Sequence, residues 1–489
     1  MSINRKQNWL FTLLITALFF TLPVKAQVTV GSSVAPQKFS ILELISSESG
    51  LRLPQLTTIQ RNDLKLDLLT DPDIKEAAKG LVIYNIDTGC IEFWNGDKWV
   101  SLCGSVVMEP DGSPENPYLV CTPAQLDDMR SKPDVNYKLC ADIDLTEYIA
   151  SKVEWGSAGW EPIGKNSEPP FTGSFDGAGY TISGLWIYRP APSYGPVGLF
   201  GVVNDGGTVK NLKVVIDAKN INAGINTYVG GVVGHVFGDG SVISNCCVTG
   251  GTIVGGNSVG GVAGRVDIGN SSITGCYASV DVKGANGIGG VVGQVSSETP
   301  GERGGSLTNS YATGNITGNT GVGGVTGRVN FGAEGTVSVG VIMSNCYATG
   351  MISRSTENES TATKYLGGVV GRFDNHGTVS NCVALNSGVS TTFGYAAFVG
   401  RISPNKEGSS SKLINNWALE NMVIKDSSGS AKSPLDNTAN GLDGADVSDA
   451  NSKTENWWKT TSSLGWDWTT VWTFDTTISA YPILKWQAP

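Results

Sequence analysis

Apolar and small residues alternate with polar turns in a pattern that repeats through most of the chain. The clearest copy, Val229–Val236, reads Val-Gly-Gly-Val-Val-Gly-His-Val, and related copies begin at residues 197, 259, 288, 322, 366 and 396. The third glycine recurs every 29 to 44 residues, and short β-branched runs with Gly or Asn turns fill the intervals. Such runs indicate strands, and strands repeated at a regular period predict a solenoid. We therefore expect an all-β fold, a right-handed parallel β-helix with one coil per repeat.

One helix is expected near the start of this solenoid, between Thr122 and Lys132. Thr122 can cap the helix and Pro123 suits its first position. Leu126 and Met129 lie three residues apart, as the apolar face of a helix requires.

A second motif, typified by the run Ser-Asn-Cys-Tyr-Ala that ends at Ala348, lies between copies of the first. Alternate residues of a strand point to opposite sides, so equivalent residues of stacked coils form inward and outward columns. The cysteine column, which includes Cys346, is small and apolar and should face inward as small hydrophobes. A hydroxyl introduced at Cys346 would cost about 1–3 kcal/mol if it found no partner. The asparagine before each cysteine suits a left-handed turn.

Two outward columns are candidate binding stripes. The aromatic stripe contains Tyr277, Tyr311, Tyr347 and Trp417. It could stiffen neighbouring strands by mutual stacking or offer a flat platform for glycan rings. The basic stripe contains Arg265, Arg328, Arg372 and Arg401. It could be a solvated face neutralised by nearby aspartates or could bind an anionic polysaccharide.

The N-terminal segment predicts that the protein is exported. Residues 1–26 combine a basic start, an apolar core and a small residue at the end, which is typical of a secretory signal peptide. No later stretch is long and apolar enough for a membrane span, so we expect a secreted or cell-surface protein. The formal charge of −10 argues against a nucleic-acid partner.

The Gly-Gly-Val-x-Gly and Asn-Cys-Tyr-Ala-Thr-Gly motifs resemble the GLUG repeat of bacterial surface proteins over roughly residues 110–425. That repeat occurs in adhesin-like proteins and beside some immunoglobulin-A-cleaving metallopeptidases, so the resemblance implies a β-helix but no single function. Residues 50–61, 80–85 and 90–103 resemble an N-terminal module of secreted Gram-negative proteins. We expect four parts: a signal peptide at 1–26, a module at 27–104, the β-helix at 105–425 and a C-terminal part at 426–489.

Export also favours disulfides. Cys90 and Cys103 flank a predicted hairpin over residues 91–100, and a turn between Gly96 and Asp97 would place them opposite each other. Cys121 and Cys140 flank the expected helix and could form a second bridge.

The C-terminal part begins with a polar loop at 426–454 and ends with six tryptophans between residues 457 and 486. An open solenoid end exposes apolar core and strand edges, so we interpret the tryptophans as a cap over the last coil. A sugar-stacking site is the alternative.

Enzymatic motifs are scarce. With histidine only at 235 and 376, the chain has no His-Glu-x-x-His site and no serine triad, and it offers no cofactor or metal motif. A polysaccharide lyase or hydrolase would need paired or calcium-bound carboxylates, for which Asp142, Asp144 and Asp176 are the candidates, although all three lie in predicted turns.

Loop lengths point to a further surface. The loops after Gly293 and Gly327 are longer than their equivalents and consecutive, so they should stack as a ridge that could contact a partner. Its candidate contact residues are Glu298, Glu302, Arg303, Phe331 and Glu334.

Three functional hypotheses follow from the sequence. The first is an exported, adhesin-like binding protein that recognises a polysaccharide or a host or matrix surface without catalysis. The second is a carbohydrate-active β-helix enzyme, and the third is a structural spacer.

Overall fold

The computed structural model describes residues 28–30, 42–44, 51–69, 71–103, 110–165, 168–191, 195–267, 269–297, 304–331, 340–355, 364–375, 377–390, 397–408, 410–425, 428–432 and 435–488. The expected signal peptide lies outside these residues, as do Glu298, Glu302, Arg303 and Glu334 of the expected ridge. Phe331 ends a strand, but its side chain is not among the described ones. The chain divides into two compact units, Met1–Glu109 and Pro110–Pro489, which are described separately.

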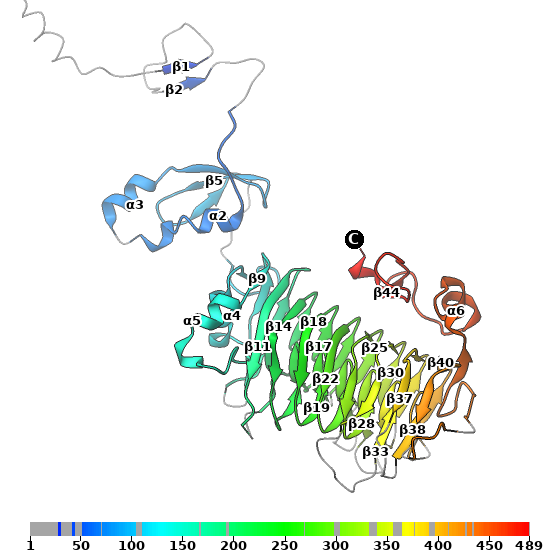
Figure 1. Cartoon of the computed structure of the whole chain (residues 1–489). Coiled ribbons are helices and arrows are strands. Elements are labelled where there is room, and N and C mark those ends of the chain that lie inside the picture. The colour runs from blue at the N-terminus through cyan, green and yellow to red at the C-terminus, as the bar shows by residue number, and fades with distance from the viewer. Residues whose placement is uncertain are drawn as a thin grey trace, which may run out of the picture. The chain divides into compact units, whose positions relative to one another are not determined.

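The first unit holds a small mixed sheet with short helices (Figure 1). Its elements are β1 (Val28–Val30), β2 (Leu42–Leu44), β3 (Gln55–Leu56), α2 (Thr58–Asn62), η1 (Leu66–Leu68), α3 (Pro72–Ala78), β4 (Val82–Asn85), β5 (Cys90–Trp94) and β6 (Trp99–Ser101). Ile83, Trp94 and Trp99 form its core. A buried ion pair joins Arg61 to Glu92 at 2.9 Å, and Asn85 donates a further hydrogen bond to that carboxylate.

Both cysteine pairs that the sequence suggested are joined in the structure. Strands β5 and β6 pair with Phe93 opposite Val100, a register that leaves Cys90 and Cys103 facing each other with Cα atoms 5.8 Å apart. In the second unit, Cys121 is bonded to Cys140, and their Cα atoms are 5.1 Å apart.

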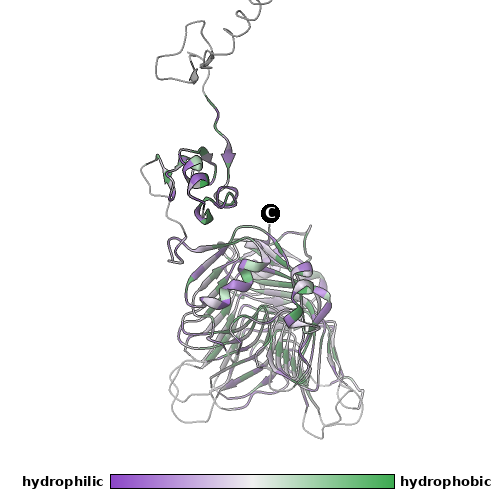
Figure 2. Cartoon of the chain, turned by 90° about the vertical axis from the view of Figure 1, so that its left-hand side faces the viewer, coloured by the Kyte–Doolittle hydropathy of each residue, from purple (hydrophilic) through white to green (hydrophobic). Residues whose placement is uncertain are grey.

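The second unit is the expected parallel β-helix, with about seven regular turns and an entry region before them (Figure 1). Each regular turn passes through four parallel sheets in order: the β12 sheet, the ten-stranded sheet, the fourteen-stranded sheet and the β15 sheet. Successive turns superpose when the stack is seen from its first turn (Figure 2).

The strands of the four sheets are as follows. The ten-stranded sheet contains β7 (Tyr118–Val120), β8 (Asn136–Leu139), β10 (Ser174–Asp176), β13 (Thr208–Lys210), β17 (Val242–Ser244), β21 (Ser272–Thr274), β25 (Ser306–Thr308), β30 (Val341–Ser344), β35 (Gly377–Ser380) and β39 (Lys412–Ile414). The fourteen-stranded sheet contains β9 (Ile143–Asp144), β11 (Thr181–Tyr188), β14 (Lys213–Asn222), β18 (Cys247–Val254), β22 (Tyr277–Lys283), β26 (Tyr311–Ala312), β27 (Ile316–Gly318), β31 (Tyr347–Ala348), β32 (Ile352–Arg354), β36 (Val383–Ala384), β37 (Gly388–Ser390), β40 (Trp417–Leu419), β41 (Val423–Lys425) and β42 (Ala445–Val447). The β12 sheet contains β12 (Phe200–Val203), β16 (Val233–Val236), β20 (Ala263–Val266), β24 (Val292–Ser297), β29 (Thr326–Phe331) and β34 (Val370–Phe373). The β15 sheet contains β15 (Thr227–Val229), β19 (Asn257–Gly260), β23 (Asn286–Gly289), β28 (Thr320–Gly323), β33 (Lys364–Gly367) and β38 (Ala397–Gly400).

The third glycine of the repeat has a packing role. A Cβ atom on Gly264 would lie 2.3 Å from the backbone nitrogen of Val229, one turn earlier in the β15 sheet. Gly293 and Gly327 meet the next turns of that sheet at equally short distances. The β12 and β15 sheets therefore pack backbone against backbone, which only glycine permits.

The asparagine column has the predicted conformation. Asn211, Asn245, Asn309, Asn345, Asn381 and Asn415 all have a positive φ between 50° and 57°. Their amides also form a ladder along the stack, in which Asn245 donates to Asn211 at 3.2 Å and Asn345 donates to Asn309 at 3.1 Å.

The cysteine column points inward, as expected, and Cys246, Cys276, Cys346 and Cys382 are fully buried. The serine in this column, Ser310, donates its hydroxyl to the Thr308 carbonyl at 2.8 Å and accepts from the Cys276 amide. Cys346 Sγ lies 3.1 Å from the equivalent Ser344 carbonyl. A hydroxyl at Cys346 would find the same acceptor, so its cost falls below the range for an unpartnered hydroxyl.

Short helices cover the entry to the solenoid. They are α4 (Pro123–Asp128), η2 (Met129–Ser131), α5 (Thr146–Ser151) and η3 (Val153–Trp155). Helix α4 is the one that the sequence predicts, with Thr122 as its N-cap in a capping box and Pro123 as its first residue.

The C-terminal segment, residues 435–488, belongs to the solenoid unit and does not form a separate domain. It contains β42, α6 (Asp449–Ser452), η4 (Trp457–Thr461), β43 (Trp472–Thr473), β44 (Ile483–Leu484) and η5 (Lys485–Gln487). Strand β42 extends the last turn by pairing with β40, which fits the expected cap. The tryptophans follow the side of the stack, where α6 and β44 lie (Figure 1): Trp457 packs against Trp417 of the last turn, whereas Trp486 donates to the Gly275 carbonyl several turns back.

Candidate functional site

The aromatic stripe stacks as one column but is not a free platform. The rings of Tyr277 and Tyr311 are 5.0 Å apart and those of Tyr311 and Tyr347 are 4.7 Å apart, nearly parallel in both pairs. The expected solvent exposure is wrong, because Tyr311 and Tyr347 are buried and Tyr277 and Trp417 are partly buried. The cover is the C-terminal segment: Tyr347 donates its hydroxyl to the Pro482 carbonyl and Trp472 packs against both buried rings. Burial raises the pKa of Tyr311 and Tyr347.

The basic stripe forms a column of the β12 sheet over five turns. His235, Arg265, Gln294, Arg328 and Arg372 lie in direct register on strands β16, β20, β24, β29 and β34. The column is exposed only in part, because Arg265 and Gln294 are buried while Arg328 and Arg372 are partly exposed. Arg401 does not belong to this column, because β38 pairs Gly400 with Gly367 and so places Arg401 beyond Gly368. It is fully buried at the last turn, where it donates to the Leu419 and Gly444 carbonyls and pairs with Asp446. Its role is to fix the closing segment rather than to bind a ligand.

Two aspartates neutralise the stripe unevenly. Asp267 pairs with Arg265 at 2.7 Å and with His235 at 2.8 Å. Burial alone would raise the pKa of Asp267, but the hydrogen bond from His235 and the charge of Arg265 lower it overall. Asp374 pairs with both Arg328 and Arg372 at 2.7 Å, so two guanidinium groups share one carboxylate there. Both arginine side chains remain about a third exposed.

A groove of about 360 Å³ lies beside the two exposed arginines, and we call it the arginine groove. Its lining residues are Asn257, Ser258, Asn286, Gly287, Gln294, Thr320, Gly321, Arg328 and Arg372. One side is made by side chains of the β12 sheet and the other by the first residues of strands in the β15 sheet. Gln294 accepts a hydrogen bond from Ser258 at 3.1 Å, and Asn286 donates to Asn257 at 2.7 Å.

The floor of this groove depends on one column of the β15 sheet. In successive turns the column holds Tyr228, Ser258, Gly287, Gly321, Tyr365 and Phe398. Aromatic rings occupy both ends, and the residues between them are serine and glycine, so the middle is open. Arg265 lies over the Tyr228 ring, and Arg372 lies 4.8 Å over the Tyr365 ring.

This column was missed from the sequence, although a signal was present. Each of its members directly precedes the apolar residue that opens the Gly-Gly motif, as in Tyr228-Val229, Gly287-Ile288 and Tyr365-Leu366. A change from aromatic to glycine and back to aromatic at one repeat position marks a local cavity in a stacked solenoid.

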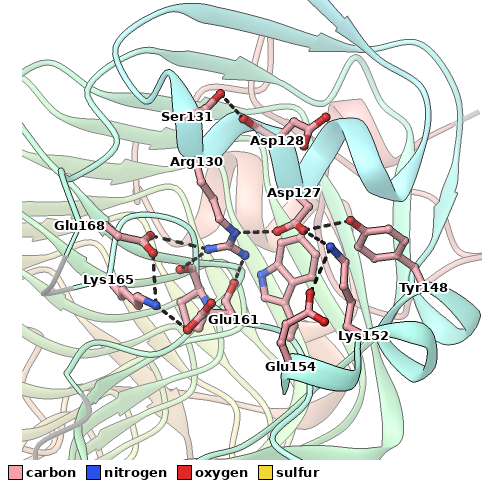
Figure 3. A network of polar contacts seen from close by, with 12 residues as sticks. Asp127, Asp128, Arg130, Ser131, Tyr148, Lys152, Glu154, Glu161, Lys165 and Glu168 are labelled. Atoms are coloured by element: carbon pink, nitrogen blue, oxygen red, sulfur yellow. Dashed lines mark hydrogen bonds and ion pairs between the residues drawn. The ribbon is translucent and has the colours of Figure 1, made fainter. Parts of the chain in front are cut away.

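A second polar cluster lies at the entry helices (Figure 3). Asp127 accepts hydrogen bonds from Arg130 and Tyr148 and pairs with Lys152 at 2.9 Å. Arg130 also donates to the Pro162 carbonyl and lies 5.1 Å over the Trp160 ring. Burial would raise the pKa of Asp127, but its hydrogen bonds with Arg130 and Lys152 outweigh that and lower it. These contacts tie α4 and α5 to each other and to residues 160–162 before the first regular turn.

The three sequence candidates for carboxylate catalysis serve turns. Asp142 accepts from the Thr181 amide at 2.7 Å, and Asp144 accepts from the Thr146 amide at 2.9 Å. Asp176 accepts from the Ala178 amide and from Asn211, the first member of the asparagine ladder. All three carboxylates therefore accept hydrogen bonds that stabilise turns or the asparagine ladder.

Comparison with known proteins gives two kinds of match. A family model described as the phage tail like trimerisation region matches residues 29–115. Parts of the chain are also similar to parts of two curated proteins. One is the "Putative Gly-rich membrane protein" of Evansella cellulosilytica, 40% identical over 29% of this chain and 16% of that protein. The other is "Halomucin" of Haloquadratum walsbyi, 35% identical over 36% of this chain and 2% of that protein. The chain therefore spans less than a fifth of the length of the curated relatives it matches.

Among solved structures, the chain is similar to one described as a "putative immunoglobulin A1 protease from Bacteroides ovatus". The identity is 22%, the TM-score is 0.47, and the match covers 77% of this chain and 94% of that one. In the described part of this chain, no helix is both long and apolar enough to cross a membrane.

Proposed function

We propose that the protein is an exported, adhesin-like surface protein that binds a saccharide in the arginine groove without catalysis. The observation that carries the proposal is the groove itself, in which amides, hydroxyls and two guanidinium groups surround a floor opened by Gly287 and Gly321. The resemblance of the repeats to those of bacterial surface proteins and the similarity to a membrane protein and a halomucin support the location.

The lining chemistry suits a sugar. Sugar hydroxyls both donate and accept, and the side chains of Asn257, Asn286 and Gln294 also do both. Arg328 and Arg372 share one carboxylate, so one positive charge remains to face the ligand. A planar guanidinium recognises carboxylate or sulfate through paired hydrogen bonds. The ligand class that fits is a short saccharide that carries one acidic group.

Filling the groove is expected to abolish this binding. Tyr228 occupies the same column as Gly321 with a φ of 61°, close to the 63° of Gly321, so the substitution Gly321→Tyr introduces a side chain that this position of the coil already holds elsewhere. We expect Gly321→Tyr to weaken binding of acidic saccharides on a glycan array by about tenfold or more while the fold is kept, because the ring occupies the ligand volume.

The matched control is Gly240→Tyr, at an exposed glycine with a φ of +76° and open space around it. It should bind as the unaltered chain does. If Gly321→Tyr bound every saccharide that the unaltered chain binds, or if the unaltered chain bound none, the proposed function would be wrong.

A second proposal concerns assembly of the first unit. Its described surface carries a concentration of exposed large apolar side chains: Leu51, Leu64, Leu68, Ile74, Leu81, Ile86, Ile91 and Leu102. Exposed apolar side chains gathered in so small a unit are typical of an association surface. Together with the match to a trimerisation region, this supports a homotrimer formed through the first unit. Three linked grooves would then bind a multivalent surface far more tightly than one groove.

Assembly is tested by measuring the molar mass in solution by light scattering. We expect three chains per particle for the exported protein and one chain for the double variant Leu68→Glu/Ile74→Glu, because burying two carboxylates at the interface is unfavourable. Val153→Glu, at an 89% exposed position of the second unit, is the control and should stay trimeric. A monomeric unaltered protein would contradict this proposal.

A further inference from the structure

A second and larger groove lies at the neighbouring corner of the coil, where the fourteen-stranded sheet passes into the β15 sheet. We call it the lysine groove, and its volume is about 620 Å³. Five consecutive turns contribute to it. The lining residues are Gly224, Ile225, Val254, Gly255, Gly256, Lys283, Gly284, Ala285, Thr317, Asn319, Arg354 and Ser355.

Small residues keep the floor of the groove low. A Cβ atom on Gly256 would lie 2.3 Å from the Ile225 carbonyl oxygen, so that turn cannot carry a side chain. Ala285 follows Gly256 in the next turn, and Asn319 follows Ala285, as the backbone hydrogen bonds between them show. The groove therefore runs along the solenoid axis. Its floor holds no side chain at Gly256, a methyl group at Ala285 and an amide at Asn319.

Asn319 is the feature that points to a ligand. Its side chain lines the groove and is 93% buried, being 7% exposed, and its Oδ1 atom accepts no hydrogen bond from any described residue. A buried amide oxygen without a donor is unfavourable, and rotation of the Asn319 amide toward the groove would let a ligand hydroxyl satisfy it.

The charge of the groove is positive. Lys283 is exposed and makes no ion pair with any carboxylate that the structure describes, whereas Arg354, two turns further along the axis, is 94% buried, being 6% exposed, and already has polar partners. The described lining residues include no aspartate or glutamate. In a chain with a formal charge of −10, this corner is a local site for anions.

We propose that the lysine groove binds an extended acidic polysaccharide that lies along the solenoid axis. Successive turns are separated by about 4.8 Å, which is close to the length of one sugar ring in an extended chain. The polymer would then place one ring on each turn, with an acidic group near Lys283 and a hydroxyl on Asn319. The inference deepens the proposed function, since both concern saccharides, but it uses no residue of the arginine groove.

The test is calorimetric titration of the full chain with oligogalacturonate long enough to span five turns, with uncharged dextran of equal length in parallel. Lys283→Glu reverses the charge, and Ala285→Tyr fills the groove from a position that already carries a side chain. We expect each to weaken oligogalacturonate binding by about tenfold or more, because like charge and lost volume both oppose the ligand. The control Lys412→Glu makes the same charge change at an exposed site elsewhere and should bind normally.

The outcomes separate this inference from the proposed function. If Lys283→Glu and Ala285→Tyr bound oligogalacturonate like the unaltered chain, or if dextran bound equally well, the inference would be overturned. Loss of polymer binding in Gly321→Tyr alone would place the polymer in the arginine groove and also overturn it. Sensitivity to Lys283 and Ala285 together with unchanged binding in Gly321→Tyr supports it, whether or not short saccharides bind in the arginine groove.

Discussion

Replacing Gly293 by alanine is expected to lower the free energy of unfolding of the solenoid by about 3 kcal/mol or more. The added Cβ atom would lie 2.3 Å from the backbone carbonyl carbon of Ser258 and from the backbone nitrogen of Val259. Neither is the end of a flexible side chain, so the β12 and β15 sheets would have to move apart. That movement would disturb the packing of the turns on either side.

The matched control is Gly287→Ala, six residues earlier. There the new Cβ atom would meet nothing closer than 3.6 Å, but the φ of +69° disfavours alanine. We expect that change to cost about 1–2 kcal/mol. Denaturant unfolding followed by circular dichroism measures both values. A Gly293→Ala variant as stable as Gly287→Ala would show that the sheets can separate without cost.

The sequence predicted the solenoid well because each repeat carries its own evidence. The Gly-Gly-Val-x-Gly motif marks the place where two sheets touch, and this contact recurs from Gly234 to Gly371. Because the turns stack, residues at equivalent motif positions lie directly above one another. The inward direction of the cysteines and the left-handed conformation of the asparagines can therefore be predicted from a single turn. Within the repeats, the residue preferences of each turn and the register between turns favour the same structure. A sequence pattern predicts a fold when these two levels agree.

Contacts between distant segments could not be predicted in this way. Tyr347 lies at an outward position of its strand, yet its hydroxyl donates a hydrogen bond to the carbonyl of Pro482, which lies 135 residues further along the chain. Arg401 was aligned with Arg372 from the sequence, but strand β38 pairs Gly400 with Gly367, so Arg401 lies one turn beyond Gly368 and the segment around Asp443 closes over it. The first error arises because the C-terminal segment covers a surface that the repeat pattern alone leaves open, and the second arises because the last copy of the motif is incomplete.

The candidate site was predicted in part. Arg328 and Arg372 were predicted to face outward as members of the basic stripe, with nearby aspartates to neutralise them, and the structure shows that Asp374 pairs with both. The groove beside them exists because Gly287 and Gly321 carry no side chain at a column position that holds an aromatic ring in other turns. Glycines were interpreted as turn and packing residues throughout, so two that open a cavity were indistinguishable from the rest.

Replacing Trp472 by alanine is expected to lower the free energy of unfolding by about 3–5 kcal/mol, the usual cost of removing a large buried aromatic side chain. Trp472 is fully buried in β43, 4.4 Å from the Trp466 ring and about 6 Å from the rings of Tyr311 and Tyr347. The indole is the link between the C-terminal segment and the tyrosine column, so its loss leaves a cavity on both sides.

The control is Trp468→Ala, in the same segment but only partly buried, which should cost less than half as much. Guanidinium unfolding gives the stabilities, and ultraviolet titration gives a second readout. Burial raises the pKa of Tyr311 and Tyr347, so the folded state favours their neutral form, and the stability this provides is lost as the pH rises above about 10, the ordinary tyrosine value. In the Trp472 variant these tyrosines should ionise at lower pH. Unchanged tyrosine ionisation together with an unchanged midpoint would mean that the segment covers the column without the indole.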